Sequence, residues 1–172
     1  QRDPWTVIVR DQQGRPAFFE YPADVDARGE PQSKASGFGE GEKSSGATWV
    51  TFGLDPEEGL FGLGEKFTVV DKRGQRIVVW NRNPYGASKE LAYKNIPFMV
   101  SSRGYGLFLN DSRRSTWNLG SESNFAGTIE VDGLGLDLFI IVGASMKEVL
   151  SGYAELTGYA PLPPRWSFGV WL

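Results

Sequence analysis

Short apolar runs separated by turn-forming residues recur along most of the chain. The runs are rich in Val, Ile, Phe, Tyr and Trp, and Gly, Pro, Asp and Asn lie between them, a pattern typical of strands joined by turns. The expected strands span residues 6–10, 17–21, 48–54, 61–70, 75–81, 96–101, 106–110, 115–119, 128–131 and 136–142. The first two flank a loop with Gly and Pro, which predicts a hairpin. The close spacing predicts a mainly β fold, an antiparallel sandwich or barrel.

A polar stretch at residues 23–47 interrupts this pattern. It consists largely of Gly, Ser, Glu and Lys, with Phe38 as its only aromatic residue. Such a segment cannot bury enough apolar surface to offset the entropy of ordering it, so we expect a long flexible loop. Its glycines lack the spacing of a dinucleotide-binding loop, which argues against a nucleotide site.

One helix is expected near the C-terminal end. Ser145 and Glu148 have the spacing of a capping box, and Gly158 is a typical helix stop. Between them an apolar stripe at helical spacing predicts a face packed on the core. The stripe consists of Met146, Val149, Leu150, Tyr153 and Leu156.

A stiff, extended connector follows the helix, because three of residues 161–164 are proline. Residues 165–172 after it are strongly apolar and predict a strand buried on both faces, as in a parallel barrel. We therefore expect a sandwich domain at residues 1–160 and, at residues 161–172, a linker and the first strand of a second domain.

The composition excludes several classes of catalytic and metal site. The chain has no histidine and no cysteine, which excludes Ser-His-Asp and Cys-His nucleophiles, zinc held by His and Cys, and disulfides. Lys and Arg total 18 against 21 Asp and Glu, so no basic surplus favours nucleic acid. No apolar run approaches the roughly 20 residues of a membrane span. These features predict a soluble protein, and the lack of cysteine favours a cytoplasmic one.

Several segments, taken in order, resemble the N-terminal part of glycoside hydrolase family 31, the α-glucosidase and α-xylosidase family. Each segment alone is weakly specific, but their joint occurrence in one order is hard to produce by chance. The segments are FGLGEKF at residues 61–67, WN at 80–81, AYKNIPF at 92–98, RGYGLFLN at 103–110, YAELTG at 153–158 and LPPRWSFGVWL at 162–172.

The resemblance implies a fold and an activity. In the family, the N-terminal domain is a β-sandwich similar to galactose mutarotase, and the Leu-Pro-Pro segment leads into the first strand of a (β/α)₈ barrel. Members are retaining α-glycosidases in which one Asp attacks the anomeric carbon and another protonates the leaving oxygen. Because both lie on later barrel strands, we expect this chain alone to be inactive. The resemblance implies no cofactor, and the carbohydrate substrate is expected to bind through that barrel. A homo-oligomer is an open alternative to a monomer.

The loop after Trp80 is the candidate site. In family 31 a sandwich loop reaches over the barrel mouth and gives a polar residue, commonly Asp, to the first sugar. Here Asn83 occupies that place, and an amide both donates and accepts hydrogen bonds whereas a carboxylate only accepts. Arg82 and Tyr85 are further substrate-binding candidates, because a guanidinium donates to hydroxyls and a phenol ring stacks on a sugar. The alternative is a plain β-turn at residues 84–86.

The remaining singled-out residues have structural interpretations. We expect Glu65 to bind backbone N–H groups rather than act in catalysis. Trp80 and Phe98 are predicted to pack between the two sheets, and Trp166 and Trp171 at the junction with the barrel. The other carboxylates, expected at turns or strand ends, are Asp71, Asp111, Asp132 and Asp137.

Three functions remain open at this point. The chain is a domain of a retaining α-glycosidase that closes the active site with the Asn83 loop, a non-catalytic carbohydrate-binding module, or a structural domain that covers apolar barrel surface. Residues 93–98 resemble α-xylosidases more than animal-type α-glucosidases. Substrate choice is expected to reside in barrel residues. Since sandwiches host many functions, the fold alone cannot choose.

Overall fold

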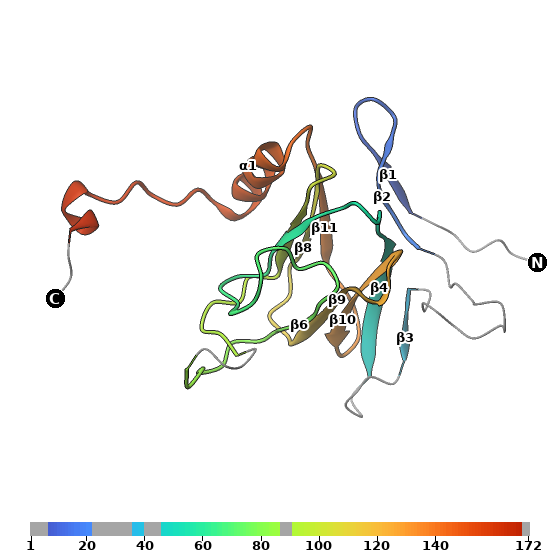
Figure 1. The fold of residues 1–172 in the computed structure, drawn as a ribbon, viewed down its shortest axis with the longest axis horizontal. Helices are drawn as coiled ribbons and strands as arrows, with labels where there is room; N and C mark the ends of the chain where they lie inside the picture. The colour runs from blue at the N-terminus through green and yellow to red at the C-terminus, as the bar shows by residue number, and fades with distance from the viewer. Residues whose placement is uncertain (1–6, 22–35, 40–45, 87–90, 170–172) are drawn as a thin grey trace, which may run out of the picture.

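The computed structural model describes residues 7–21, 36–39, 46–86 and 91–169. These parts form a mainly antiparallel β fold with one α-helix, as predicted (Figure 1). The strands are β1 (Ile8–Arg10), β2 (Pro16–Phe19), β3 (Gly37–Gly39), β4 (Ala47–Gly53), β5 (Leu60–Gly62), β6 (Arg76–Val79), β7 (Phe98–Ser101), β8 (Tyr105–Leu109), β9 (Ser115–Ser123), β10 (Ala126–Asp132) and β11 (Leu138–Val142).

Two sheets make the sandwich. One has five strands in the order β3-β4-β10-β9-β6, and the other has four in the order β11-β8-β7-β5. The predicted N-terminal hairpin is confirmed, because β1 pairs with β2 in a small separate sheet. Every paired strand runs antiparallel to its neighbour, so the alternation of side chains sends one face of each sheet inward.

The main core lies between the sheets. Trp117 of β9 is fully buried there, and its indole N–H donates to Ser115 Oγ at 3.1 Å. Ile129 of β10 and Leu107 of β8 contribute to the same cluster from the two sheets. A buried indole needs a partner for its N–H, and the Ser115 hydroxyl supplies one within the strand.

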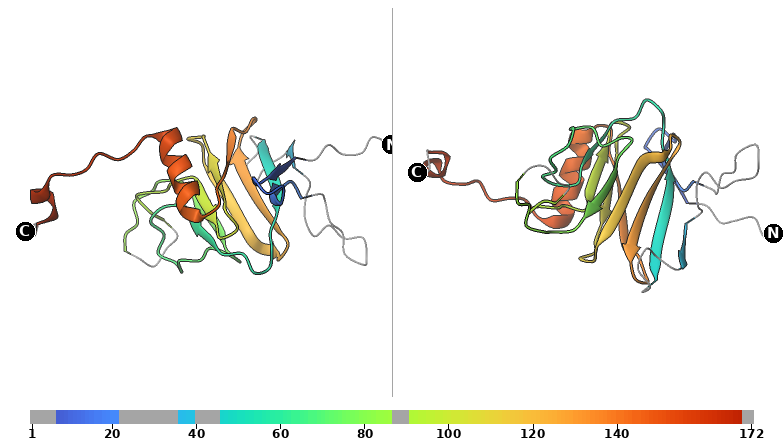
Figure 2. Two further views of the ribbon diagram at one scale, coloured as in Figure 1. Left: turned by 90° about the horizontal axis from the view of Figure 1, so that it is seen from above. Right: turned by 60° about the horizontal axis from the view of Figure 1, so that its bottom comes forward.

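Helix α1 (Met146–Thr157) covers the outer face of the four-stranded sheet (Figure 2). Ser145 Oγ accepts from Glu148 N, and the helix ends at Gly158, so both predicted ends are confirmed. The Phe98 ring stacks on Tyr153 with 4.0 Å between ring centroids. Gly106 makes this approach feasible, because a Cβ there would come within 2.6 Å of Val149 Cγ1.

Two packing predictions need correction here. Phe98 is buried, but between its sheet and α1 rather than between the two sheets. The predicted apolar stripe of the helix is only partly buried, since Val149 and Tyr153 pack on the sheet while Met146, Leu150 and Leu156 are exposed. The stripe predicted from the sequence is therefore wider than the face that packs on the sheet.

The predicted strand at residues 61–70 is wrong beyond Gly62. Gly62, Leu63 and Gly64 have φ values of 117°, 64° and 84° in succession, which no strand tolerates. Leu63 is fully buried, and core burial of its side chain offsets the cost of a left-handed conformation at a residue with a Cβ. The turn redirects the chain toward residues 94–98, where Leu63 N donates to Phe98 O at 2.9 Å.

Two further segments differ from expectation. Part of the predicted flexible loop at residues 23–47 is strand β3, which pairs Phe38 with Thr48 of β4; residues 23–35 and 40–45 lie outside the described parts. The apolar segment predicted as a barrel strand begins as a 3₁₀ helix, Arg165–Phe168, with Trp166 72% exposed. Trp171 lies outside the described residues. Figure 1 shows the described part of this segment, which ends at Gly169, extending away from the sandwich.

Candidate functional site

The Asn83 segment, defined as residues 81–86, leaves the end of strand β6 and lies at the surface. Arg82, Asn83 and Tyr85 are all exposed, and Tyr85 is 88% exposed. Pro84 between them is buried. The segment therefore turns one proline inward and presents an amide, a guanidinium and a phenol to solvent, all of which can bind sugar hydroxyls or faces.

A network of hydrogen bonds centred on Asn95 holds the base of this segment. Asn95 Nδ2 lies 2.8 Å from Asn81 Oδ1, 3.0 Å from Trp80 O and 3.0 Å from Ala92 O. Its backbone N–H also donates to Asn81 Oδ1 at 2.9 Å. From the sequence, Asn95 is notable only as part of the AYKNIPF segment and no role is predicted for it, because an Asn between strands is ordinarily a turn residue.

The Gly62–Gly64 turn lies against the backbone of residues 94–96. Glu65 N donates to Lys94 O at 2.8 Å, and Gly64 lies so close to Lys94 O that a side chain there has no room. Lys66 Nζ donates to Val78 O of β6 at 2.7 Å. The segments FGLGEKF and AYKNIPF, distant in sequence, are thus side by side.

The expectation for Glu65 is wrong. Its carboxylate is exposed and forms an ion pair with Lys94 Nζ at 3.2 Å, rather than binding backbone N–H groups. An ion pair with both side chains in solvent contributes at most about 1 kcal/mol.

Trp80 is also not where the sequence placed it. It is 41% exposed and lines a surface cavity of about 280 Å³ instead of the core. Asn81, Asn95, Pro97 and residues 111–113 line the same cavity. An aromatic residue, two amides and an ion pair therefore surround one cavity beside the Asn83 segment.

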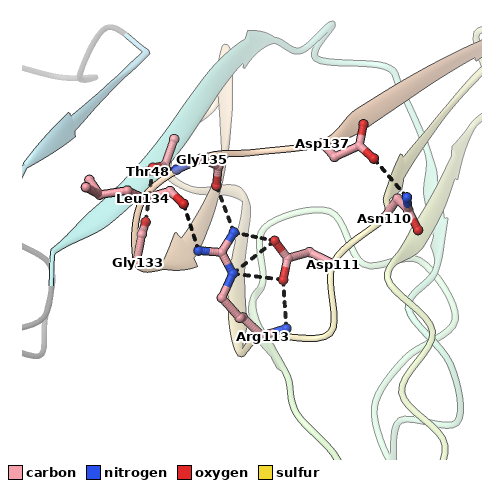
Figure 3. A network of polar contacts seen from close by, with 8 residues as sticks. All are labelled: Thr48, Asn110, Asp111, Arg113, Gly133, Leu134, Gly135 and Asp137. Atoms are coloured by element: carbon pink, nitrogen blue, oxygen red, sulfur yellow. Dashed lines mark hydrogen bonds and ion pairs between the residues drawn. The ribbon is translucent and has the colours of Figure 1, made fainter.

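Arg113 lines this cavity, and each nitrogen of its guanidinium donates a hydrogen bond (Figure 3). Its guanidinium pairs with both Asp111 oxygens and donates to Leu134 O at 3.0 Å and Gly135 O at 2.9 Å. The side-chain hydrogen bonds from Arg113 hold the pKa of Asp111 below its usual range. Both carboxylate oxygens of Asp111 therefore have partners within the fold, which agrees with its predicted turn position.

The other predicted turn and strand-end carboxylates have comparable partners. Asp137 Oδ2 accepts from Asn110 Nδ2 at 2.8 Å, and Asp71 Oδ1 accepts from Leu60 N at 3.0 Å. Asp132 ends β10 and lies 3.6 Å from Arg114. These contacts give each carboxylate a role in the fold.

Sequence reasoning missed a buried carboxyl group, Glu58, which is only 3% exposed. Its Oε1 accepts from Ser101 Oγ and from Tyr105 OH, each at 2.5 Å, and its Oε2 accepts from Asp55 N at 2.9 Å. Burial, and then the nearby Glu58, raise the pKa of Tyr105 well above its usual value. Glu58 stands in a polar stretch between two strands, so no periodicity signals its burial.

Neither a metal cluster nor a membrane-spanning helix emerges from the parts of the chain that the structure describes. Across residues 7–21, 36–39, 46–86 and 91–169, no three His, Cys, Asp or Glu residues are grouped so that they could hold a metal ion. Within the same ranges no helix is long and apolar enough to cross a membrane.

The arrangement around Asn83 offers hydrogen-bonding groups and aromatic surface, which suits binding of a polyhydroxyl compound.

Comparison with known proteins agrees with this fold and these motifs. A family model described as "Glycosyl hydrolase 31 N-terminal galactose mutarotase-like domain" matches residues 1–118. The chain is 45% identical over 123 residues to the alpha-xylosidase XylQ of Lactiplantibacillus pentosus and 43% identical over 127 residues to an alpha-xylosidase of Emericella nidulans. These matches cover 72% and 74% of this chain but only 16% of each relative, so the chain spans a small part of their length.

A solved structure extends the likeness beyond the sequence matches. The GH31 dextranase FjDex31A of Flavobacterium johnsoniae, complexed with glucose, is 28% identical and superimposes with a TM-score of 0.78. That match covers 95% of this chain and 19% of the dextranase chain. The family match and the two α-xylosidases together show that the chain belongs to glycoside hydrolase family 31, as its N-terminal galactose mutarotase-like domain.

Proposed function

We propose that this chain is the N-terminal domain of a retaining α-glycosidase that hydrolyses terminal α-linked xylose or glucose. The observation that carries the proposal is the 45% identity to an α-xylosidase. Xylosides are therefore the first substrates to test. The two catalytic aspartates belong to the barrel that follows in the longer protein, which leaves this domain a role in binding.

In this proposal the Asn83 segment reaches the sugar bound at the barrel mouth. Asn83 is exposed, and Asn81 at the start of its segment is fixed to the sandwich by Asn95. Its amide can donate to one sugar oxygen and accept from another hydroxyl. Arg82 supplies further donors, and the exposed ring of Tyr85 supplies a face for the C–H side of the sugar.

The first experiment compares hydrolysis of nitrophenyl α-xyloside and nitrophenyl α-glucoside by the full-length protein and by this 172-residue chain. We expect activity in the full-length protein alone, with the faster substrate naming the sugar. Hydrolysis by the 172-residue chain would contradict the assignment of catalysis to the barrel.

The second experiment tests the loop. We expect Asn83→Ala in the full-length protein to lower kcat/KM about tenfold, the usual scale for one lost hydrogen bond to a sugar. The matched control is Asn124→Ala, because Asn124 is also exposed and lies on the turn between β9 and β10. Equal kinetics for the two variants would remove Asn83 from the mechanism.

A second candidate function is supported by the C-terminal segment. Leu162, Trp166 and Phe168 are all largely exposed, as is one edge of the helix. Large apolar side chains gathered at one end of a domain are typical of a surface that another domain covers. In this alternative the sandwich mainly supports the barrel, and Asn83→Ala would leave the kinetics unchanged.

A further inference from the structure

The side chain of Asn95 contacts both sides of the base of the Asn83 segment. Asn81 forms an isolated parallel bridge with Ala92, and Arg82 N donates to Ala92 O at 3.2 Å. Asn95 Nδ2 donates to Ala92 O, to Trp80 O and to Asn81 Oδ1. One amide thus ties the outgoing chain at residues 80–81 to the returning chain at residue 92.

The donors of Asn95 fix the direction of its amide. Its Nδ2 has three oxygen acceptors within 3.0 Å, whereas its Oδ1 is buried and has no hydrogen-bond partner among the residues that the structure describes. Turning the amide over would place an oxygen against those three acceptors, which is worse than one unpaired acceptor. An aspartate at this position has the same shape but would meet the same acceptors with oxygen on both sides.

The backbone on either side of Asn95 is fixed to the sandwich. Its neighbour Lys94 accepts from Glu65 N at 2.8 Å, and Phe98 O at the start of β7 accepts from Leu63 N at 2.9 Å. The amide therefore transmits the position of strand β7 to the Asn83 segment rather than moving with it.

We propose that Asn95 is a positioning residue that holds Asn83 in place for the sugar. The inference rests on the proposed function and names a residue that does not itself touch the substrate. If Asn95 acts only by positioning Asn83, losing Asn95 after Asn83 has been removed costs nothing further. The effects of the two substitutions on kcat/KM should therefore be non-additive.

The test uses the full-length protein with Asn95→Asp, Asn83→Ala and both changes together. Each single change is expected to lower kcat/KM about tenfold, and the double variant should lose about tenfold rather than about a hundredfold. Asn124→Asp is the matched control, since it makes the same chemical change on an exposed turn. Additive losses, or an unchanged Asn95→Asp, would overturn the inference.

Hydrogen exchange separates this inference from the proposed function. The amide of Arg82 donates to Ala92 O across the base of the segment, so its exchange should accelerate at least about tenfold in Asn95→Asp and stay unchanged in Asn83→Ala. If Asn83→Ala has no kinetic effect, the proposed loop contact fails, while exchange at Arg82 still decides whether Asn95 holds the segment. Unchanged exchange would overturn the inference by itself.

A milder variant covers the case in which Asn95→Asp does not fold. Asn81→Ala removes the Oδ1 atom that accepts two of the four hydrogen bonds from Asn95 and leaves Asn95 in place. It should accelerate exchange at Arg82 in the same direction by a smaller factor. No acceleration in this variant would equally overturn the role of Asn95.

Discussion

The Glu58 cluster and the Asn95 network use similar polar chemistry for different ends. In the Glu58 cluster, defined as Glu58, Ser101 and Tyr105, every member is buried and the contacts join a loop to strands β7 and β8. In the Asn95 network the central amide is half-buried and its partners lead to exposed residues. Buried networks stabilise the fold, whereas networks at the base of a surface segment determine where that segment lies.

Glu58→Ala is the substitution with the largest expected effect, and it tests whether the Glu58 cluster stabilises the fold. The change leaves the Tyr105 and Ser101 hydroxyls buried without their acceptor, so we expect the free energy of unfolding to fall by about 3 kcal/mol. Urea denaturation measures it. Glu57→Ala is the control, because Glu57 is adjacent and exposed and should change stability by less than about 0.5 kcal/mol. Equal changes in the free energy of unfolding for the two variants would show that the Glu58 cluster does not stabilise the fold.

Tyr105→Phe is expected to have a smaller effect, about 1–2 kcal/mol, because the ring still packs edge-on against Phe18 and only the hydroxyl is lost. Its pH dependence has a defined sign. Burial raises the pKa of Tyr105, so the folded state keeps its proton above about pH 10, where an unfolded tyrosine ionises. Stability should therefore fall as pH rises above about 10, and less steeply in Tyr105→Phe. Parallel alkaline unfolding curves would contradict this.

Asp111→Asn should have the smallest effect, at most about 1 kcal/mol at pH 7, since Arg113 keeps its two backbone acceptors. Hydrogen bonds from Arg113 lower the pKa of Asp111, so its contribution is present above about pH 4 and disappears as pH falls below that value. Thermal unfolding from pH 7 to pH 2 should show the wild type and the variant converging. A constant difference across that range would exclude the ion pair as the cause.

The sequence was informative where local pattern decides structure. Short apolar runs between turn residues located β4, β8, β10 and β11, and Ser145 and Gly158 located the ends of α1. Predictions from the sequence were wrong where the structure depends on a backbone conformation or on a residue distant in sequence. Gly62 and Gly64 permit positive φ values, but Leu63 between them does not reveal one, and the apolar character of Trp80 does not distinguish a core residue from a residue that lines a cavity.

Part of the candidate site could likewise be predicted from the sequence and part could not. The exposed segment around Asn83 was predictable from its polar turn residues and its resemblance to family 31. Asn95 was not, because its importance arises from acceptors at Trp80, Asn81 and Ala92 that come together only in the fold. Side chains that hold a segment from outside it carry no local signal of that role.

The order of the five-stranded sheet has a consequence for synthesis on the ribosome. Strand β4 pairs residues 47–53 with residues 126–132 of β10, so its second edge stays open until β10 has been made. At roughly 5–20 residues per second the wait is on the order of 4–17 s. During that interval β4 presents Val50 and Phe52 on an incomplete sheet, which is the state most open to chaperone capture or misassociation. Translation speed between these two strands is therefore a variable that the yield of folded protein should follow.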